Sequence, residues 1–301
     1  MCIRDRDNHL PFNDITKQNE IDIPPFDILL AGFPCQAFSI AGKRGGFEDT
    51  RGTLFFDVAR IIKHHRPKAF LLENVKGLVN HKSGKTLNTI LNVLSKELEY
   101  TFVKYKVLDA KYFGVPQKRE RIFIVGFDKY GGGFEFPNQK IVTSSIGDII
   151  EENVVSSKYY LSDTLLASLR KHKERHAAKG NGFGYEIKSF DDLANAIVIG
   201  GMGKERNLLI DKRLKDFTPV TKIKGKVNRE GVRRMTPLEW ERLQGYPDRW
   251  TEGVSDTQRY KQLGNSVAVP VIAAIANNIF KELSNPTVYI DKSKLQLELQ
   301  F

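Results

Sequence analysis

The sequence predicts an α/β fold with a mostly parallel sheet, and three observations carry this prediction. Apolar runs of strand length occur at residues 27–32 and 69–72. Between them, residues 53–65 repeat apolar side chains at helical spacing until Pro67 ends the pattern. Because strands that alternate with helices usually form a parallel sheet, this order predicts an α/β domain.

The elements follow in order along the chain. We expect buried strands at 27–32 and 69–72, with a helix at 53–65 between them. A helix over 86–98 and strands over 102–108 and 121–127 come next. A strand, helix, strand crossover returns the chain parallel to itself, so both buried strands end at one edge of the sheet.

That edge should gather the chemically active side chains. Cys35 lies just past the first strand and Glu73 just past the second, where open α/β sheets bind ligands. The link 109–119 has no helical period and is too short for a crossover. We therefore expect the last strand to run antiparallel and to bring Arg119 and Arg121 to the same edge.

A second, smaller domain follows the sheet. Residues 141–226 show no regular period and are rich in glycine and charge, whereas 236–243 again has a helical pattern. We divide the chain into a first domain at 1–140, a second, small domain at 141–232 and a return to the first domain at 233–301. The last part should hold a helix at 269–283 and a tail from 285 onward.

Composition narrows the class of protein. The 301 residues carry a formal charge of +11, and 18 Lys and Arg stand against 9 Asp and Glu between residues 158 and 234. This balance favours a polyanionic partner, of which DNA, RNA and a membrane surface are examples. No apolar run is long enough to span a bilayer and the start has no secretory signal, so we expect a cytoplasmic protein without a membrane partner.

Cys35, Glu73 and the charged run 117–121 each allow two interpretations from the sequence. Two cysteines cannot build a disulfide framework or a zinc site, so we expect no metal and a reduced thiol. Cys35 is either a nucleophile, activated by nearby arginines, or a small apolar residue in the core. Glu73 is either a proton donor to a ring nitrogen or a surface residue at a helix start. The run 117–121 is either part of the site or a solvated charge cluster.

Four short motifs then carry a specific resemblance. Pro-Cys-Gln at 34–36, Glu-Asn-Val at 73–75, Gln-Lys-Arg-Glu-Arg at 117–121 and Gly-Asn-Ser-Val at 264–267 occur in order, and the segment 233–248 joins them. Together they resemble the motifs of DNA cytosine-C5 methyltransferases of bacterial restriction-modification systems. The resemblance implies a Rossmann-like, S-adenosylmethionine-dependent methyltransferase sheet with a small target-recognition domain.

The resemblance also implies a role for each matched residue. Cys35 adds to C6 of a flipped-out cytosine, Glu73 contacts its N3 and amino group, Arg121 steadies the activated ring and Arg119 supports the site. S-adenosylmethionine is the implied cofactor, and the residues that we expect to bind it are Asp14, Ile15, Pro34, Leu54, Asn265 and Ser266. The implied DNA contacts are Gln36, Ser39, Lys43 and Arg44. Duplex DNA is the expected partner of a monomer, with a cognate restriction endonuclease as a functional partner.

One family feature has no match in this sequence. The Gly-rich turn that cradles the methionine part of the cofactor does not precede Asp14, and residues 1–7 show no strand pattern. We therefore expect the first strands to be absent, an edge of the sheet to be exposed and cofactor affinity to be low in this chain.

Two other functions remain open from the sequence. An RNA cytosine-C5 methyltransferase uses the same nucleophile, although the long basic insert favours reading of DNA. A noncatalytic DNA-binding fragment agrees with the missing turn, whereas intact Cys35, Glu73, Arg119 and Arg121 favour an enzyme.

Overall fold

The structure is a computed structural model, and it describes residues 14–34, 54–141, 143–182, 184–199, 203–220 and 225–289. Its chain divides into two compact units. The sheet unit comprises the described residues within 3–108, 120–138 and 273–301, and the small-sheet unit those within 109–119 and 139–272.

The sheet unit is built on four strands in the order β1-β2-β5-β3. Their bounds are β1 Ile28–Gly32, β2 Ala69–Val75, β3 Phe102–Asp109 and β5 Glu120–Phe127. β1 and β2 are parallel whereas β2 and β5 are antiparallel, so the described sheet is mixed rather than mostly parallel. The expected antiparallel direction of the last strand is confirmed.

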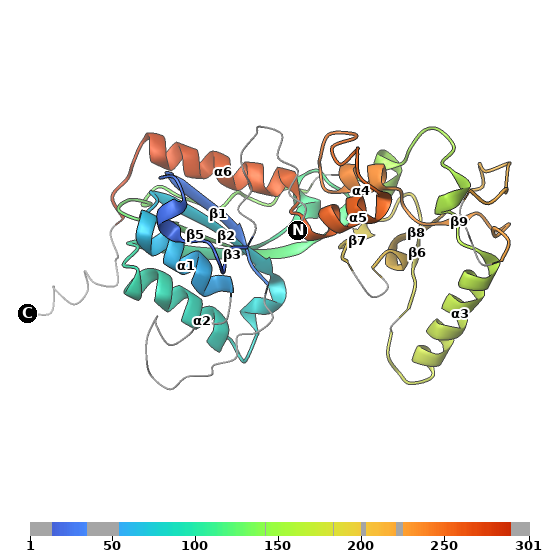
Figure 1. Cartoon of the computed structure of the whole chain (residues 1–301), viewed down its shortest axis with the longest axis horizontal. Coiled ribbons are helices and arrows are strands. Elements are labelled where there is room, and N and C mark those ends of the chain that lie inside the picture. The colour runs from blue at the N-terminus through green and yellow to red at the C-terminus, as the bar shows by residue number, and fades with distance from the viewer. Residues whose placement is uncertain are drawn as a thin grey trace, which may run out of the picture. The chain divides into compact units, whose positions relative to one another are not determined.

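Helices cover both faces of this sheet. α1, Leu54–His65, and α2, Lys85–Asn92, lie on one face, and α6, Val269–Ser284, lies on the other (Figure 1). α1 forms because apolar residues recur at helical spacing, and its buried members are Phe55, Val58, Ala59, Ile61 and Ile62. All of these except Ile61 pack with side chains of β2 and α2 into one apolar cluster, which fixes β2 against the helices.

Three expectations for the sheet unit need correction. β1 is not buried, because it has a neighbour on one side only among the described strands, and Leu30 is 62% exposed. The helix expected over 86–98 ends as an α-helix at Asn92 and continues as π-helix over Val93–Glu97. The first residues of the expected tail pack against the sheet unit. The Thr287 carbonyl accepts a hydrogen bond from the Gly132 amide at 3.0 Å, and the Tyr289 ring contacts the Phe102 ring.

The small-sheet unit contains a two-stranded sheet, a three-stranded sheet and three helices that lie wholly within it. β4, Gln117–Lys118, pairs in parallel with β7, Ala194–Asn195. The other sheet has the order β6-β8-β9, with β6 Ile187–Lys188, β8 Leu208–Ile210 and β9 Val232–Arg233. The helices are α3 Asp163–Ala177, α4 Pro237–Leu243 and α5 Asp256–Asn265.

The helix expected at 236–243 is confirmed as α4, whose start is encoded locally. Thr236 caps the helix and Pro237 occupies its first turn. The Glu239 carboxylate accepts a hydrogen bond from the Thr236 amide at 2.8 Å. Two helices were not predicted from the sequence, α3, which buries only Leu166 and Leu169, and α5.

Within the described residues, no single helix is both long and apolar enough to cross a membrane. α5 and α6, which are bent by 41° at the break between them, meet the length and composition criterion only as a pair.

Candidate active site

The ends of three strands bring two of the expected catalytic residues together. Gly32 of β1 is the register partner of Glu73 in β2, and Val75 of β2 is the partner of Arg121 in β5. The Arg121 Nε atom lies 3.0 Å from the Glu73 Oε1 atom, and the two side chains are 15% and 18% exposed. The predicted meeting of these strand ends at one edge is therefore confirmed for Glu73 and Arg121.

Burial shapes the electrostatics of this pair. Burial lowers the pKa of the Arg121 guanidinium, and the Glu73 carboxylate acts in the opposite direction. An arginine still keeps its charge, because its ordinary pKa lies far above neutral. A carboxylate beside a permanent cation, with limited access to water, can hold a polar ring through directed hydrogen bonds.

Gly32 leaves room for the Glu73 carboxylate. A Cβ atom at position 32 would lie 3.3 Å from the Glu73 Oε2 atom, which is tighter than an ordinary van der Waals contact. A side chain on β1 at this point would require the Glu73 carboxylate to shift slightly. The glycine therefore leaves the carboxylate its observed position across the parallel pair.

Asn74 ties the end of β1 to β2, and the sequence analysis assigned no role to this side chain. It is 2% exposed, and its Nδ2 atom donates a hydrogen bond to the Phe33 carbonyl at 2.7 Å. Its Oδ1 atom accepts a bond from the Val75 amide at 2.8 Å. Phe33 is itself buried against Phe55, so the chain is held two residues before Cys35. The sequence signal for this role was the presence of a polar residue, Asn74, inside an apolar strand.

Several expected residues lie outside the described part of the chain. Residues 35–53 are not described, so the structure does not test the expectations for the nucleophile or the DNA contacts. These residues are Cys35, Gln36, Ser39, Lys43 and Arg44. On either side of this segment, Pro34 is exposed and Leu54 begins α1 with a partly buried side chain.

Arg119 and the Gly-Asn-Ser-Val motif belong to the small-sheet unit. Arg119 is 4% exposed, and its guanidinium donates to the Ile197 carbonyl at 2.8 Å and the Ser266 carbonyl at 2.6 Å. Asn265 ends α5 with an exposed side chain, and the Ser266 hydroxyl donates to the Leu263 carbonyl at 2.7 Å. Arg119 therefore ties two distant segments of its own unit together, a role that its spacing from Arg121 did not reveal.

The residues expected at the cofactor's adenine lie at the start of the described chain. Asp14 is exposed, and its Oδ1 atom accepts bonds from the Thr16 amide at 3.1 Å and the Thr16 hydroxyl at 2.8 Å. These bonds lower the pKa of Asp14. Ile15 is partly buried and packs, like Leu54, against the apolar cluster of α1, β2 and α2. A carboxylate next to apolar side chains suits a ring with an amino group.

In the part of the chain that the structure describes, no three His, Cys, Asp or Glu side chains gather as they do around a metal ion.

Comparison with known proteins gives a consistent result. The family model described as C-5 cytosine-specific DNA methylase matches residues 4–281. The Type II methyltransferase M.HpaII of Haemophilus parainfluenzae is 63% identical over 282 residues, which cover 92% of this chain and 78% of that protein. The Type II methyltransferase M.SsoII of Shigella sonnei is 48% identical over 280 residues, which cover 91% and 69%.

Solved structures agree in fold. The S. pombe Dnmt2 methyltransferase has a TM-score of 0.63 at 18% identity, with 91% of this chain and 84% of that chain covered. The Entamoeba histolytica methyltransferase EhMeth has a TM-score of 0.61 at 21% identity, with 85% and 78% covered. These likenesses concern the fold, and they agree with the Rossmann-like methyltransferase architecture expected from the sequence.

Proposed function

Because the chain belongs to the C-5 cytosine-specific DNA methylase family and is thereby a DNA cytosine-5 methyltransferase, we propose that it methylates one specific cytosine in duplex DNA by covalent catalysis. The target base leaves the stack, and the Cys35 thiolate bonds to its C6 atom. The observation that carries this proposal is the Glu73–Arg121 pair, in which the Arg121 Nε atom lies 3.0 Å from the Glu73 Oε1 atom at one edge of the sheet. The end of β1, which precedes Cys35, belongs to the same edge.

The chemistry explains why these groups act together. Cytosine C5 is a poor nucleophile until a thiolate adds to C6, which pushes electrons toward N3 and leaves an enamine across C4 and C5. Glu73 delivers a proton or a strong hydrogen bond to N3, and Arg121 holds the Glu73 carboxyl group and steadies the activated ring. After C5 has gained the methyl group, the C5 proton passes to water and the Cys35 thiolate leaves C6. N3 returns its proton to Glu73, and the aromatic ring is restored.

S-adenosylmethionine supplies the methyl group as an electrophile when it is bound. Asp14 and Ile15 fit its adenine, since Asp14 offers a carboxylate and Ile15 an apolar side chain beside Leu54. We assign Pro34, Asn265 and Ser266 to the remaining contacts on the strength of their motifs. These side chains bind and orient the cofactor, and the nucleophile comes from the segment that follows β1 in the sequence.

Recognition of the DNA sequence is the proposed task of residues 141–232, the target-recognition domain. The segment 158–234 carries 18 Lys and Arg against 9 Asp and Glu, which suits contact with phosphates. We assign DNA contacts to Gln36, Ser39, Lys43 and Arg44, which follow Cys35 in the sequence. Flipping costs about a few kcal/mol, which these DNA contacts must supply.

The relatives named Type II methyltransferases support a place in a restriction-modification system. We propose that the protein acts as a cytoplasmic monomer and protects DNA from a cognate restriction endonuclease.

The proposal is tested by transfer of a labelled methyl group from S-adenosylmethionine. The purified chain is incubated with duplex DNA of varied sequence and, in parallel, with tRNA, and the products are digested to nucleosides. Label in 5-methylcytosine from duplex DNA alone supports the proposal. Label from tRNA alone would make the chain an RNA methyltransferase. Calorimetry with S-adenosylmethionine separates an enzyme from a noncatalytic DNA-binding protein.

A further inference from the structure

A hollow of about 360 Å³ in the small-sheet unit has a basic lining that the proposed mechanism does not use. Three cations line it, Lys204, Arg234 and Lys261, with Glu205 as the one carboxylate among the lining residues. Its aromatic lining consists of the buried rings of Trp240 and Tyr260. A lining with three cationic side chains and one carboxylate favours the binding of an anion.

The single carboxylate is already engaged. The Glu205 Oε1 atom accepts bonds from Arg234 Nη2 at 2.6 Å and from Arg234 Nε at 3.0 Å. The Asp256 carboxylate at the start of α5 accepts from Lys158 at 2.8 Å and from the Tyr159 hydroxyl at 3.0 Å. Among the residues that the structure describes, neither Lys204 nor Lys261 forms an ion pair.

Lys204 is held over an aromatic ring instead. Its Nζ atom lies 4.2 Å from the centre of the Tyr260 ring. Burial lowers the pKa of Lys204, Arg234 lowers it further, and Glu205 and Asp256 act in the opposite direction. An anion in the hollow would relieve the repulsion between Lys204 and Arg234.

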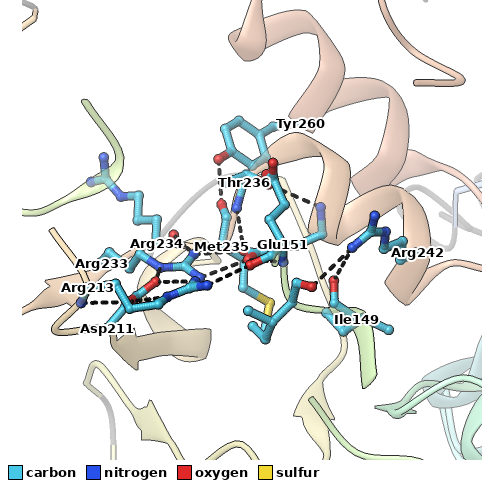
Figure 2. A network of polar contacts seen from close by, with 12 residues as sticks. Ile149, Glu151, Asp211, Arg213, Arg233, Arg234, Met235, Thr236, Arg242 and Tyr260 are labelled. Atoms are coloured by element: carbon cyan, nitrogen blue, oxygen red, sulfur yellow. Dashed lines mark hydrogen bonds and ion pairs between the residues drawn. The ribbon is translucent and has the colours of Figure 1, made fainter. Parts of the chain in front are cut away.

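A hydrogen bond and ring packing hold the aromatic wall of the hollow. The Tyr260 hydroxyl donates to the Met235 carbonyl at 2.6 Å, and the Tyr260 ring packs edge-on against Trp240 with centroids 4.8 Å apart. Next to Arg234, the fully buried Arg233 bonds both oxygens of Glu239 at 2.8 Å and Asp211 at 2.9 Å. Figure 2 shows Arg233 and Arg234 leaving the backbone in different directions. Arg233 thereby fixes the backbone from which Arg234 reaches the hollow.

We propose that this hollow binds a backbone phosphate of the DNA substrate, with Lys204, Arg234 and Lys261 as its cationic ligands. The inference rests on the proposed function, because DNA is the polyanion that the enzyme meets. Val198 and Ile199 also line the hollow and are 39% and 43% exposed, so apolar surface for a deoxyribose adjoins the cations. The two lysines contact phosphates as point charges, and the Arg234 guanidinium already directs its Nε and Nη2 atoms to Glu205, so the contact positions the DNA without selecting its sequence.

The test measures duplex DNA affinity of the full chain by fluorescence anisotropy across a series of salt concentrations. Lys204→Gln, Lys261→Gln and the double variant are compared with Lys96→Gln, an exposed lysine of the sheet unit. We expect the double variant to reduce the salt slope by about 0.9, the value for one phosphate, and to weaken binding equally for duplexes of different sequence. Lys96→Gln should leave the slope unchanged.

A second measurement identifies the phosphate. Neutral methylphosphonates are placed one position at a time along the duplex, and one position should weaken binding by the unsubstituted chain but not by the double variant. Lys261 is exposed, so its variant keeps the test valid if Lys204→Gln loosens the packing on Tyr260.

The outcomes separate this inference from the proposed function. If the unsubstituted chain methylates DNA while the double variant keeps its salt slope, the inference is wrong and the function stands. Loss of affinity confined to one DNA sequence would make the hollow a base-reading site and would also refute it. A chain that binds RNA duplexes but no DNA duplex would overturn both.

Discussion

The Arg121 Nε atom lies 3.0 Å from the Glu73 Oε1 atom, although 47 residues lie between Glu73 and Arg121 in the sequence. The antiparallel pairing of β2 and β5 produces this proximity, because Glu73 lies two residues before Val75, the register partner of Arg121. The pair joins a permanent cation to a carboxyl group that must handle a proton in the proposed reaction.

Glu73→Gln should lower the rate of methyl transfer by about 10²–10⁴-fold, the usual contribution of an acid-base group, because the amide cannot deliver a proton. The rate is measured in single turnover at saturating DNA. Glu120→Gln is the matched control, since Glu120 forms an exposed pair with Lys76 at 2.7 Å and such pairs contribute little. Equal rates for both variants would remove Glu73 from the mechanism.

Cys35→Ala should abolish both methyl transfer and covalent capture by duplex DNA that contains 5-fluorocytosine, because no sulfur remains to attack C6. Denaturing gel electrophoresis detects the captured complex. Cys2→Ala replaces the only other cysteine and should retain capture. Capture by the Cys35 variant would assign the nucleophile elsewhere.

Asn74→Ala should destabilise the protein by about 1–3 kcal/mol, because the Phe33 carbonyl loses its buried donor. The rate of covalent capture should also fall, since the chain leading to Cys35 loses its tie to β2. Chemical denaturation and capture kinetics measure the two effects. Asn88→Ala changes an exposed asparagine of α2 and serves as the control. A stability loss with an unchanged capture rate would limit Asn74 to a structural role.

Arg233→Met should cost about 3–5 kcal/mol of stability, because the buried Glu239 carboxylate would lose its guanidinium partner and the buried Asp211 carboxylate would keep only Arg213. Denaturant unfolding of the small-sheet unit, followed by the fluorescence of buried Trp240, reports this loss. Arg170→Met breaks an exposed pair with Glu230 and should cost at most about 1 kcal/mol. Similar midpoints for the two variants would contradict the importance of burial.

Acid should weaken the same network. Asp211 has its pKa lowered from 3.8 to about 2 because hydrogen bonds from Arg213 and the charge of Arg233 outweigh its burial. A carboxyl group with a depressed pKa stabilises the fold above its unfolded value and loses that contribution as the pH falls through its folded value. Stability should therefore decline between about pH 4 and pH 2. In Asp211→Asn this part of the decline should be smaller.

Local sequence patterns were sufficient to predict much of the sheet unit. The spacing of Phe55, Val58 and Ile62 predicted α1, and the crossover rule predicted that Glu73 would follow a strand parallel to β1. The short link before β5 predicted its antiparallel direction, and with it the meeting of Glu73 and Arg121. These features depend on chain geometry over short distances.

Long-range contacts explain what the sequence did not reveal. The bonds from Arg119 reach Ile197 and Ser266, which are 78 and 147 residues away, and no local pattern encodes such partners. The exposure of Leu30 depends on which strands flank β1, not on its own apolar run. α3 was missed because only two of its residues are buried, which leaves a weak apolar period.

The pairing of β9 with β8 constrains how the length of the intervening chain can vary during evolution. Leu209 pairs with Arg233 and Ile210 with Val232, so the register decides which of the two consecutive arginines is enclosed. A shift by one residue would exchange the faces of Arg233 and Arg234, exposing one charge and burying the other beside the wrong neighbours. Insertions and deletions between β8 and β9 should therefore survive only where the loop absorbs them entirely, whatever DNA sequence the protein reads.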